Sequence, residues 1–598
     1  MGAIVAILGR DRSLGGEQAK AMLGASVHRG SDFLIKNCGR CLLGASNKPD
    51  FGDSTISREG DLMAVFSGRL DNAADMARIL RKQGMPPASD AFADVVVAAF
   101  RAFGSSAPNR MRGVFSGIVT DGNELWFFRD HLGFKPLYYR DEPRGVFVAT
   151  EAKQIIAGAS LQREANKEAI DHLLFASGTE DKPCALKGAN LVKQATIYSS
   201  GLEKALLQQR YWFPDKLLET AQLDPEEIQV KFTQLFTQAV NRCLTGNDVV
   251  SLSGGIDSAS VAAFAAPEEL RMTGRPLSAL SAVFPDLPKV DESGYIQKIV
   301  EYLGLNLHTY NIQAPILRDV RYWCDMLDGP VYTMSIPDLF ENYTLARSLG
   351  FRNILTGDIA EFVIGFRSHV ISHLLTHGRW KALGRLIGKE LDHGTSQRSI
   401  ARELMLAFIP GSFANWYLRA RRPDPRQWIP DWVDHSKIKE GPYRPDLLPP
   451  ASRRWSEQQL VAFKGSALLD ESLDMCADIC GVTVRRPFAD IDLWEFFLSL
   501  PAEIKIPDLR LKTFMRTLVK GKLPEEILNR ERKTVFNDHL KSRIDYSVLR
   551  QYLINPSIRI EGIDYQRLVA RIEREQLNMF EWMWANTMTR VHAFLSLC

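Results

Sequence analysis

The chain has 598 residues, of which 45% are hydrophobic, 24% charged and 10% aromatic. These fractions are close to those of ordinary globular proteins and exclude a mainly disordered, collagenous or disulfide-stapled chain. The 74 Lys and Arg residues nearly balance the 71 Asp and Glu residues, and the net charge of +3 argues against a chain-wide nucleic-acid surface. At about 100–200 residues per domain, the length predicts two to four domains.

Two further sequence features concern the compartment. No stretch approaches the roughly 20 apolar residues that a membrane-spanning helix needs, so we expect no membrane span. Eight cysteines in so long a chain are typical of a reducing compartment, and we expect a cytoplasmic protein. Cys38 and Cys41 could combine with Cys476 and Cys480 in a zinc site, but only the first pair has CxxC spacing. The alternative is that all four are buried, reduced thiols.

Residues 1–205 carry short apolar runs separated by turn residues, a pattern typical of antiparallel strands. We expect a first strand at the N-terminus, buried from its first residues. The other expected elements are strands near residues 41–45, 62–66, 113–119, 124–128 and 145–149, and a helix near 91–103. This layout predicts an α+β domain. The polar segment 206–225, which contains Pro214, is expected to be a linker.

From residue 226 the pattern changes to alternating helices and strands. The expected helices lie near 226–243, from 257 onward and near 292–303, and the expected strands near 248–252, 278–284 and 306–311. Such alternation predicts an α/β domain built on a parallel sheet. Beyond residue 366 the chain is expected to be mostly helical.

Segment 366–456 is unusually basic, with 16 Lys and Arg against 8 Asp and Glu. It also carries several large aromatic residues: Trp380, Trp416, Tyr417, Trp428, Trp432 and Trp455. One interpretation is a solvated helical face, and the other is a docking surface for a negatively charged or aromatic partner.

The most informative motif is Ser251-Leu252-Ser253-Gly254-Gly255-Ile256-Asp257-Ser258, which lies between an expected strand and an expected helix. Glycines allow close approach to a phosphate, and the free N–H groups of a helix N-terminus can bind it. Ser253 and Ser258 add hydroxyl groups, and Asp257 can hold Mg²⁺ against phosphate oxygens. No lysine follows the glycines, so this is not the GxxxxGK[ST] loop of phosphoryl-transfer enzymes.

The SGGxDS string resembles the pyrophosphate loop of ATP pyrophosphatases, and the rest of the chain resembles the asparagine synthetase family. The similar segments occur in the family's order: 28–32 (HRGSD), 128–139 (FRDHLGFKPLYY), 149–153 (ATEAK), 485–490 (RRPFAD), 500–501 (LP) and 523–533 (LPEEILNRERK). The resemblance implies an Ntn-type antiparallel sandwich over 1–205, which is a class II glutamine amidotransferase-like domain. It further implies an adenine-nucleotide alpha-hydrolase-like parallel-sheet domain over 226–598 with a mostly helical C-terminal part.

The resemblance also implies the site residues. ATP would be bound by Leu252, Ser253, Gly254, Gly255, Asp257, Ser258, Val283, Thr356 and Gly357, with Leu252, Val283, Thr356 and Gly357 framing the adenosine. Asp257 and Glu361 would share Mg²⁺, with Asp358 as a competing ligand. Lys533 would neutralise the α-phosphate and Arg530 belongs to the same block, although Arg532 could take the place of Lys533. Lys512 is interpreted as a solvated helix lysine, with a phosphate contact as the alternative.

The N-terminal domain departs from the family pattern at its reactive positions. The family's nucleophilic cysteine is replaced by Gly2, so no thioester with glutamine can form. The family's Asn-Gly-Glu is replaced by Ser67-Gly68-Arg69, which places a cation where the carboxylate would attract the amino group of glutamine. We therefore expect a domain without glutaminase activity that is retained as a scaffold.

The resemblance implies that ATP activates a carboxylate of the substrate as an acyl-adenylate. Without ammonia from glutamine, this acyl group must react with another amine, as it does in two groups of relatives with an inactive glutaminase domain. β-Lactam synthetases use a Glu whose place is taken here by Thr483, whereas 68–72 (GRLDN) resembles lasso peptide cyclases. The resemblance thus favours a lasso peptide cyclase that uses ATP and Mg²⁺. Its substrate would be a leaderless precursor peptide, docked on 366–456, and its expected pathway partners are a leader peptidase and a leader-binding protein. An ammonia-dependent asparagine synthetase, a β-lactam synthetase-like ligase and a non-catalytic scaffold remain alternatives.

Overall fold

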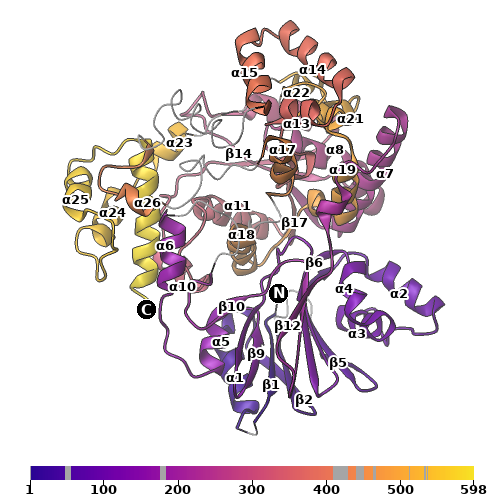
Figure 1. Cartoon of the computed structure of the whole chain (residues 1–598), viewed down its shortest axis with the longest axis vertical. Coiled ribbons are helices and arrows are strands. Elements are labelled where there is room, and N and C mark those ends of the chain that lie inside the picture. The colour runs from indigo at the N-terminus through magenta and orange to yellow at the C-terminus, as the bar shows by residue number, and fades with distance from the viewer. Residues whose placement is uncertain are drawn as a thin grey trace.

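The fold is described from a computed structural model of the chain (Figure 1). The structure describes residues 2–11, 13–47, 56–175, 183–408, 428–438, 450–461, 467–510, 512–530, 534 and 537–598. The N-terminal domain, indigo to purple in Figure 1, lies below the second domain, and the C-terminal helices stand to one side. Within these residues, no helix is both long and apolar enough to cross a membrane.

The N-terminal domain is a sandwich of two six-stranded antiparallel sheets. The first sheet has the order β10-β8-β9-β1-β3-β2, with β10 Asn190–Leu191, β8 Tyr138–Glu142, β9 Gly145–Ala149, β1 Ile4–Gly9, β3 Cys41–Asn47 and β2 Asp32–Cys38. The second has the order β12-β11-β7-β6-β5-β4, with β12 Leu207–Arg210, β11 Thr196–Gly201, β7 Glu124–Arg129, β6 Gly113–Thr120, β5 Leu62–Leu70 and β4 Ile56–Glu59. The expected Ntn-type sandwich is confirmed.

Helices cover the outer faces of this sandwich, which explains the continuous apolar run of β1. Side chains on one face of β1, including Val5 and Ile7, pack into a cluster shared with helices α1 (Gly16–Gly24) and α5 (Ala152–Gly158). Side chains on the other face, including Ile4 and Leu8, belong to the core between the sheets. Because both faces of β1 are buried, its sequence cannot alternate between apolar and polar residues. On the outer side of the second sheet lie α2 (Ala73–Lys82), α3 (Phe92–Phe103) and α4 (Ala107–Arg110).

The segment expected to be a linker contains an additional strand. β12 pairs with β11 at the sandwich edge, and a short 3₁₀ turn at Pro214–Leu217 follows. The next helix, α7 (Pro225–Cys243), begins with a capping box in which the side chain of Asp224 accepts a hydrogen bond from the backbone of Glu227. The connection between the domains is therefore shorter than 206–225.

The second domain is built on a five-stranded parallel sheet, as expected. Its order is β15-β14-β13-β16-β17, with β15 Asn306–Tyr310, β14 Ser278–Ala282, β13 Asp248–Ser251, β16 Asn353–Leu355 and β17 Thr483–Arg485. Its helices include α7, α8 (Ile256–Thr273), α9 (Ser293–Leu303), α10 (Val320–Met326), α11 (Ile336–Ser348), α12 (Ala360–Ile364), α18 (Ala467–Cys480) and α19 (Ile491–Ser499). The chain runs outward from β13 to β15 and then returns to β16, so the topological switch point lies between β13 and β16.

The remaining C-terminal half is helical, as predicted. Its helices include α13 Val370–Thr376, α14 Trp380–Asp392, α15 Gln397–Phe408, α17 Ala451–Gln459, α20 Ala502–Lys505, α21 Thr513–Leu518, α22 Glu525–Leu528, α23 Asn537–Ser542, α24 Tyr546–Leu553, α25 Tyr565–Glu573 and α26 Met579–Leu595. Trp432 and Trp455 are fully buried, so these two aromatic residues belong to the core and not to a docking face. Trp380 is exposed, and Trp416 and Tyr417 lie outside the described residues.

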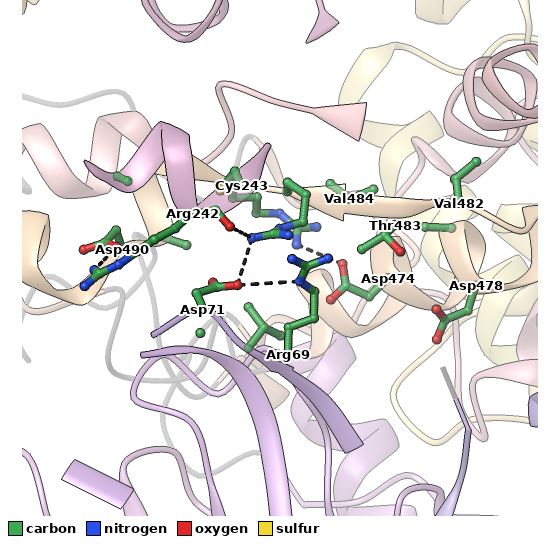
Figure 2. A pocket seen from close by; sticks show the side chains of 17 residues that line it. Arg69, Asp71, Arg242, Cys243, Asp474, Asp478, Val482, Thr483, Val484 and Asp490 are labelled. Atoms are coloured by element: carbon green, nitrogen blue, oxygen red, sulfur yellow. Dashed lines mark hydrogen bonds and ion pairs between the residues drawn. The ribbon is translucent and has the colours of Figure 1, made fainter. Parts of the chain in front are cut away.

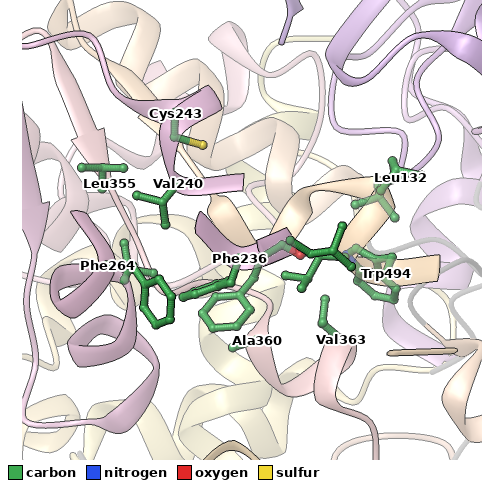
Figure 3. Close-up of a cluster of buried hydrophobic side chains, with 14 of the residues drawn as sticks. Leu132, Phe236, Val240, Cys243, Phe264, Leu355, Ala360, Val363 and Trp494 are labelled. Carbon is green, nitrogen blue, oxygen red and sulfur yellow. The ribbon is translucent and has the colours of Figure 1, made fainter. Parts of the chain in front are cut away.

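The two domains share one apolar core (Figure 3). Phe236 of α7 packs edge-to-face against Phe264 of α8 at 4.9 Å between ring centroids. The same cluster includes Trp494 of α19 and Leu132 from the N-terminal domain. Burying a side chain of this size stabilises the fold by about 1.5–3 kcal/mol, so this cluster fastens the sandwich to the nucleotide domain.

A buried polar network crosses the same boundary. Arg29 of the N-terminal domain forms ion pairs with Glu151 of its own domain and with Asp478 of α18, the second at 3.1 Å. Burial would raise the pKa of Glu151, but the charges of Arg29 and Lys153 hold it well below its usual value. Because both carboxylates stay ionised, Arg29 ties the domains together by charge as well as by packing.

Candidate active site

The motif predicted to bind phosphate forms a compact turn between β13 and α8. The hydroxyl groups of Ser253 and Ser258 lie 3.0 Å apart, and the backbone N–H of Ser253 donates to Ser258 Oγ at 3.1 Å. The N–H of Gly255, the N-cap of α8, donates to Ser253 Oγ at 3.2 Å. The two serines thus brace the loop at the N-terminus of an 18-residue helix, where free N–H groups and the helix dipole favour an anion.

The switch point places the second glycine segment against this turn. A side-chain carbon at Gly357 would lie 2.5 Å from the N of Ser258 and 2.7 Å from the carbonyl carbon of Asp257, so only glycine fits there. Thr356, the preceding residue, donates its N–H to the carbonyl of Arg485 on β17 at 2.9 Å. The carboxyl ends of β13 and β16 therefore meet directly at the loop.

The other residues expected to frame the nucleoside lie on the same edge of the sheet. Leu252 follows β13 and donates its N–H to the carbonyl of Leu280 at 2.8 Å, and Val283 follows β14 and donates to Tyr310 at 2.9 Å. Ligands of doubly wound sheets bind at this edge. The adenosine contacts of Leu252, Val283, Thr356 and Gly357 remain a prediction that the topology accommodates.

Arg530 clamps the loop from the C-terminal region. Its Nη1 donates to the carbonyl of Gly254 at 2.7 Å and its Nη2 to Glu292 Oε1 at 2.6 Å. Glu292 closes the ring by accepting the N–H of Gly254 at 3.0 Å. The guanidinium also lies 4.3 Å from the ring centroid of Tyr295. Sequence reasoning identified Arg530 but missed Glu292 and Tyr295, which belong to no motif.

Lys512 is the clearest correction at the site. It was expected to be a solvated helix lysine, but its Nζ forms an ion pair with Asp257 Oδ2, and its side chain is only 20% exposed. Lys512 has a positive φ of 60° at the N-cap of α21. The structure therefore places two cations, Lys512 and Arg530, on the motif.

The expected Mg²⁺ ligands fit the structure in part. Asp257 lies in the first turn of α8 beside Gly357, where a carboxylate can meet phosphate oxygens. Glu361 is exposed in the first turn of α12, and among the described residues no hydrogen bond or ion pair joins it to Asp257. Asp358 accepts from Thr356 Oγ1 at 2.8 Å and lies 3.8 Å from Arg486 Nε. Since Mg²⁺ is usually held by one or two carboxylates plus phosphate oxygens, Asp257 suits this role and the partnership with Glu361 stays a prediction.

Lys533 and its alternative Arg532 lie outside the described residues, so their expected contact with the α-phosphate stays a prediction. The segment that precedes them is held in place. Arg516 of α21 donates to the carbonyl of Ile527 at 3.1 Å and to that of Arg530 at 2.5 Å.

The N-terminal domain has Gly2 at the position where the family has its nucleophilic cysteine. Gly2 directly precedes the buried start of the first sheet, and its carbonyl accepts a hydrogen bond from Ser67 Oγ at 3.0 Å. Arg69 pairs with Asp71 at 3.6 Å. The thiols of Cys38 and Cys41 lie on the β2–β3 hairpin, and burial raises the pKa of Cys41 to about 12. No thiolate for a thioester is present among these residues.

The zinc alternative finds no support. Cys38 and Cys41 face each other across β2 and β3, whereas the thiols of Cys476 and Cys480 on α18 lie 4.0 Å from the carbonyls of Ile336 and Phe340. Among the described residues, no group of three or more His, Cys, Asp or Glu side chains could hold a metal ion. Among the described residues, none of the eight cysteines forms a disulfide.

Comparisons with known proteins agree with this architecture. The family model described as "Asparagine synthase" matches residues 231–591, and the model "Glutamine amidotransferase domain" matches residues 1–212. The chain is 23% identical over 500 residues to "Asparagine synthetase [glutamine-hydrolyzing] 3" of Bacillus subtilis (strain 168), covering 79% of this chain and 75% of that protein. It is 26% identical over 505 residues to "Amidase chyE" of Penicillium rubens, covering 74% and 72%.

The fold and the loop together define a two-domain, ATP-dependent ligase architecture with an amidotransferase-type sandwich in front. The chain belongs to the asparagine synthase family. Members of this family are ATP-dependent ligases that form amide bonds.

Proposed function

We propose that the protein is a lasso peptide cyclase, an ATP-dependent ligase that joins the N-terminal amine of a peptide to an Asp or Glu side chain of the same peptide. The observation that carries this proposal is the contrast between the two sites. The phosphate-binding loop is braced and carries two cations, whereas Gly2, Ser67 and Arg69 occupy the positions at which glutamine would be bound and attacked. An acyl group activated here needs an amine that glutamine does not supply.

The chemistry follows in two balanced steps. An oxygen of the peptide carboxylate attacks the α-phosphorus of ATP and pyrophosphate leaves; the peptide amine then attacks the acyl carbon, AMP leaves and the amine loses a proton. The N–H groups at the start of α8, with Lys512 and Arg530, would stabilise the negative charge that develops on the phosphates. Mg²⁺ held by Asp257 would supply further charge neutralisation.

An intramolecular amine makes a dedicated general base less important. A peptide α-amine has a pKa near 8, so a substantial fraction is neutral at physiological pH. Holding both ends of one peptide together supplies the effective concentration that a free amine lacks. Thr483, which takes the place of the β-lactam synthetase Glu, lines a pocket between the domains and offers no carboxylate. This supports a peptide amine over a poorly nucleophilic amide.

A broad groove beside the loop supports a substrate larger than an amino acid. Its empty space, solvent included, is about 1790 Å³. Arg367, from the segment expected to dock the peptide, lines it together with residues of the 509–530 region. Its charged residues are mostly basic: Arg367, Arg510, Arg516, Lys520 and Arg530 against Glu390 and Glu525. The precursor peptide would lie here, and the leader peptidase and leader-binding protein remain expected partners of the pathway.

The second candidate is an ammonia-dependent asparagine synthetase. The similar Bacillus and Mycobacterium proteins are named glutamine-hydrolyzing asparagine synthetases, which supports asparagine as the product but not ammonia as the nitrogen source. The two proposals are separated by incubating the protein with ATP, Mg²⁺ and either a leaderless precursor peptide or aspartate with ammonia. The cyclase proposal predicts AMP, pyrophosphate and a peptide lighter by one water. Asparagine formation, with every candidate peptide left linear, would overturn it in favour of the synthetase.

A further inference from the structure

A pocket between the two domains is lined by four arginines and four aspartates that the ligase chemistry does not use (Figure 2). Its empty space, solvent included, is about 680 Å³. Arg69 and Asp71 enter it from the N-terminal domain, and Arg242 and Cys243 reach it from the end of α7. Arg485 of β17 lines it as well.

Most charges in the pocket wall are paired with partners of their own. Arg242 forms ion pairs with Asp490 at 2.6 Å and Asp492 at 2.8 Å. Arg486 pairs with Asp474 at 2.8 Å. On the far side, Asp478 is held by Arg29 at 3.1 Å and Lys135 at 3.8 Å. These groups leave no net charge to be satisfied by a ligand.

Arg69 and Arg485 differ, because they share a single carboxylate. Asp71 Oδ1 lies 2.8 Å from Arg485 Nη2 and 3.6 Å from Arg69 Nε. Asp248 also acts on Arg485 electrostatically, but its carboxylate accepts hydrogen bonds from the backbone of Thr245 and Gly246 at 2.7 and 2.8 Å. Within the described residues, Asp71 is the carboxylate that forms an ion pair with both arginines.

The hydrogen bonding of the two arginines is also incomplete, although Arg485 Nη2 donates to the carbonyl of Arg242 at 2.5 Å. Arg485 is 4% exposed, and its Nη1, like the Nε of Arg69, is buried without a hydrogen-bond acceptor. Burial and the positive charge of Arg485 lower the pKa of Arg69. Leaving a buried charged donor without an acceptor is unfavourable, so a negatively charged acceptor that receives hydrogen bonds from both nitrogens would stabilise the pocket.

We propose that the pocket between the domains binds a small oxyanion, a phosphate or a carboxylate group, between the guanidinium groups of Arg69 and Arg485. Planar guanidinium groups match the spacing of two oxygens on such an anion. The carbonyl of Arg485 accepts the N–H of Thr356 at 2.9 Å, and Thr356 lies at the edge of the sheet where the nucleotide is predicted to bind. The anion would therefore lie next to that edge and contact an arginine from each domain. This inference does not depend on which amide the ligase forms.

The test is calorimetric titration of the full chain with inorganic phosphate and, separately, with acetate, at constant ionic strength and without nucleotide. We expect one of the two anions to bind, and Arg69→Gln to weaken that binding at least about tenfold. Arg69 is partly exposed, so this variant should fold. Arg78→Gln, which changes an exposed arginine of α2, is the matched control and should bind as the wild type does.

A second readout uses thermal unfolding. With saturating anion the melting temperature of the wild type should rise by about 2 °C, and that of Arg69→Gln should not. Without the anion, Arg69→Gln should melt at or above the wild type, because removing one of two like charges relieves repulsion. Equal anion affinity in wild type and Arg69→Gln, or binding of neither anion, would overturn the proposal.

Discussion

The two domains show opposite relations between fold and chemistry. The N-terminal sandwich has both sheets and their helices, yet Gly2 and Arg69 stand at the positions where the family resemblance predicts reactive residues. In the second domain the loop around Asp257 keeps its serines, its glycines and two cations. We infer that a sandwich without the family's nucleophile can persist because its packing supports the other domain, through Arg29 and the shared core. A matching fold therefore says little about which of two sites still reacts.

The largest expected effect comes from the loop carboxylate. Asp257→Ala should lower the rate of pyrophosphate release by at least about 100-fold, because it removes the carboxylate proposed to hold Mg²⁺ against the phosphates and leaves Lys512 without this ion pair. The measurement is pyrophosphate release with ATP, Mg²⁺ and a linear precursor peptide that the wild type cyclises. Asp90→Ala, at an exposed carboxylate of the N-terminal domain, is the control. Wild-type turnover by Asp257→Ala would remove this side chain from the mechanism.

Lys512 sharpens the comparison because the structure, and not the sequence, assigns it to the site. Lys512→Ala should lower turnover by about 10- to 100-fold, and Lys512→Arg should recover part of the loss if the charge is what matters. The readouts are ATP affinity by calorimetry and turnover. Lys20→Ala, at an exposed helix lysine, is the matched control. If Lys512→Ala had the ATP affinity and turnover of the wild type, Lys512 would be a solvated lysine with no role at the site.

Arg530 and Glu292 should act as one unit on the loop. Each of Arg530→Gln and Glu292→Gln should weaken ATP binding, and the double variant should be less impaired than the sum of the two, with a coupling energy of about 1–3 kcal/mol. A double-mutant cycle of ATP affinities measures this term. If the losses of ATP-binding free energy in the two single variants added up in the double variant, the hydrogen bonds among Arg530, Glu292 and Gly254 would not hold the loop as one unit.

The smallest effect on activity is expected at Glu219, where the prediction concerns stability and pH. Burial would raise the pKa of Glu219, but its hydrogen bonds with His373 and Ala502 and the charge of Arg379 lower it to about 2. Because the pKa in the folded state lies below the unfolded value of about 4.5, this stabilisation is present at neutral pH and is lost as the pH falls toward 2. At neutral pH it is worth about 3 kcal/mol at most.

Thermal unfolding of Glu219→Gln checks this prediction. The variant should melt below the wild type at about pH 7, and the gap should shrink at about pH 3. A gap that does not change with pH would mean that the ionised carboxylate is not what stabilises the segment that joins the domains.

Periodic and buried elements were predictable, and isolated polar contacts were not. Composition alone predicts the strand that contains Val249 and Val250 and the glycine turn that follows it. β12 (Leu207–Arg210) was missed because all its residues are exposed, so no alternation marks it as a strand. Lys512 and Glu292 reach the loop through tertiary packing, which leaves no spacing in the sequence to detect.

The most direct test of the central claim follows oxygen from the peptide to the nucleotide. A leaderless precursor peptide, labelled with ¹⁸O in its Asp or Glu side-chain carboxylate, is incubated with the protein, ATP and Mg²⁺ in the presence of glutamine. We predict that one labelled oxygen appears in AMP for each ring closed, and that no glutamate is released. Unlabelled AMP, or ring closure that requires glutamine hydrolysis, would contradict the account.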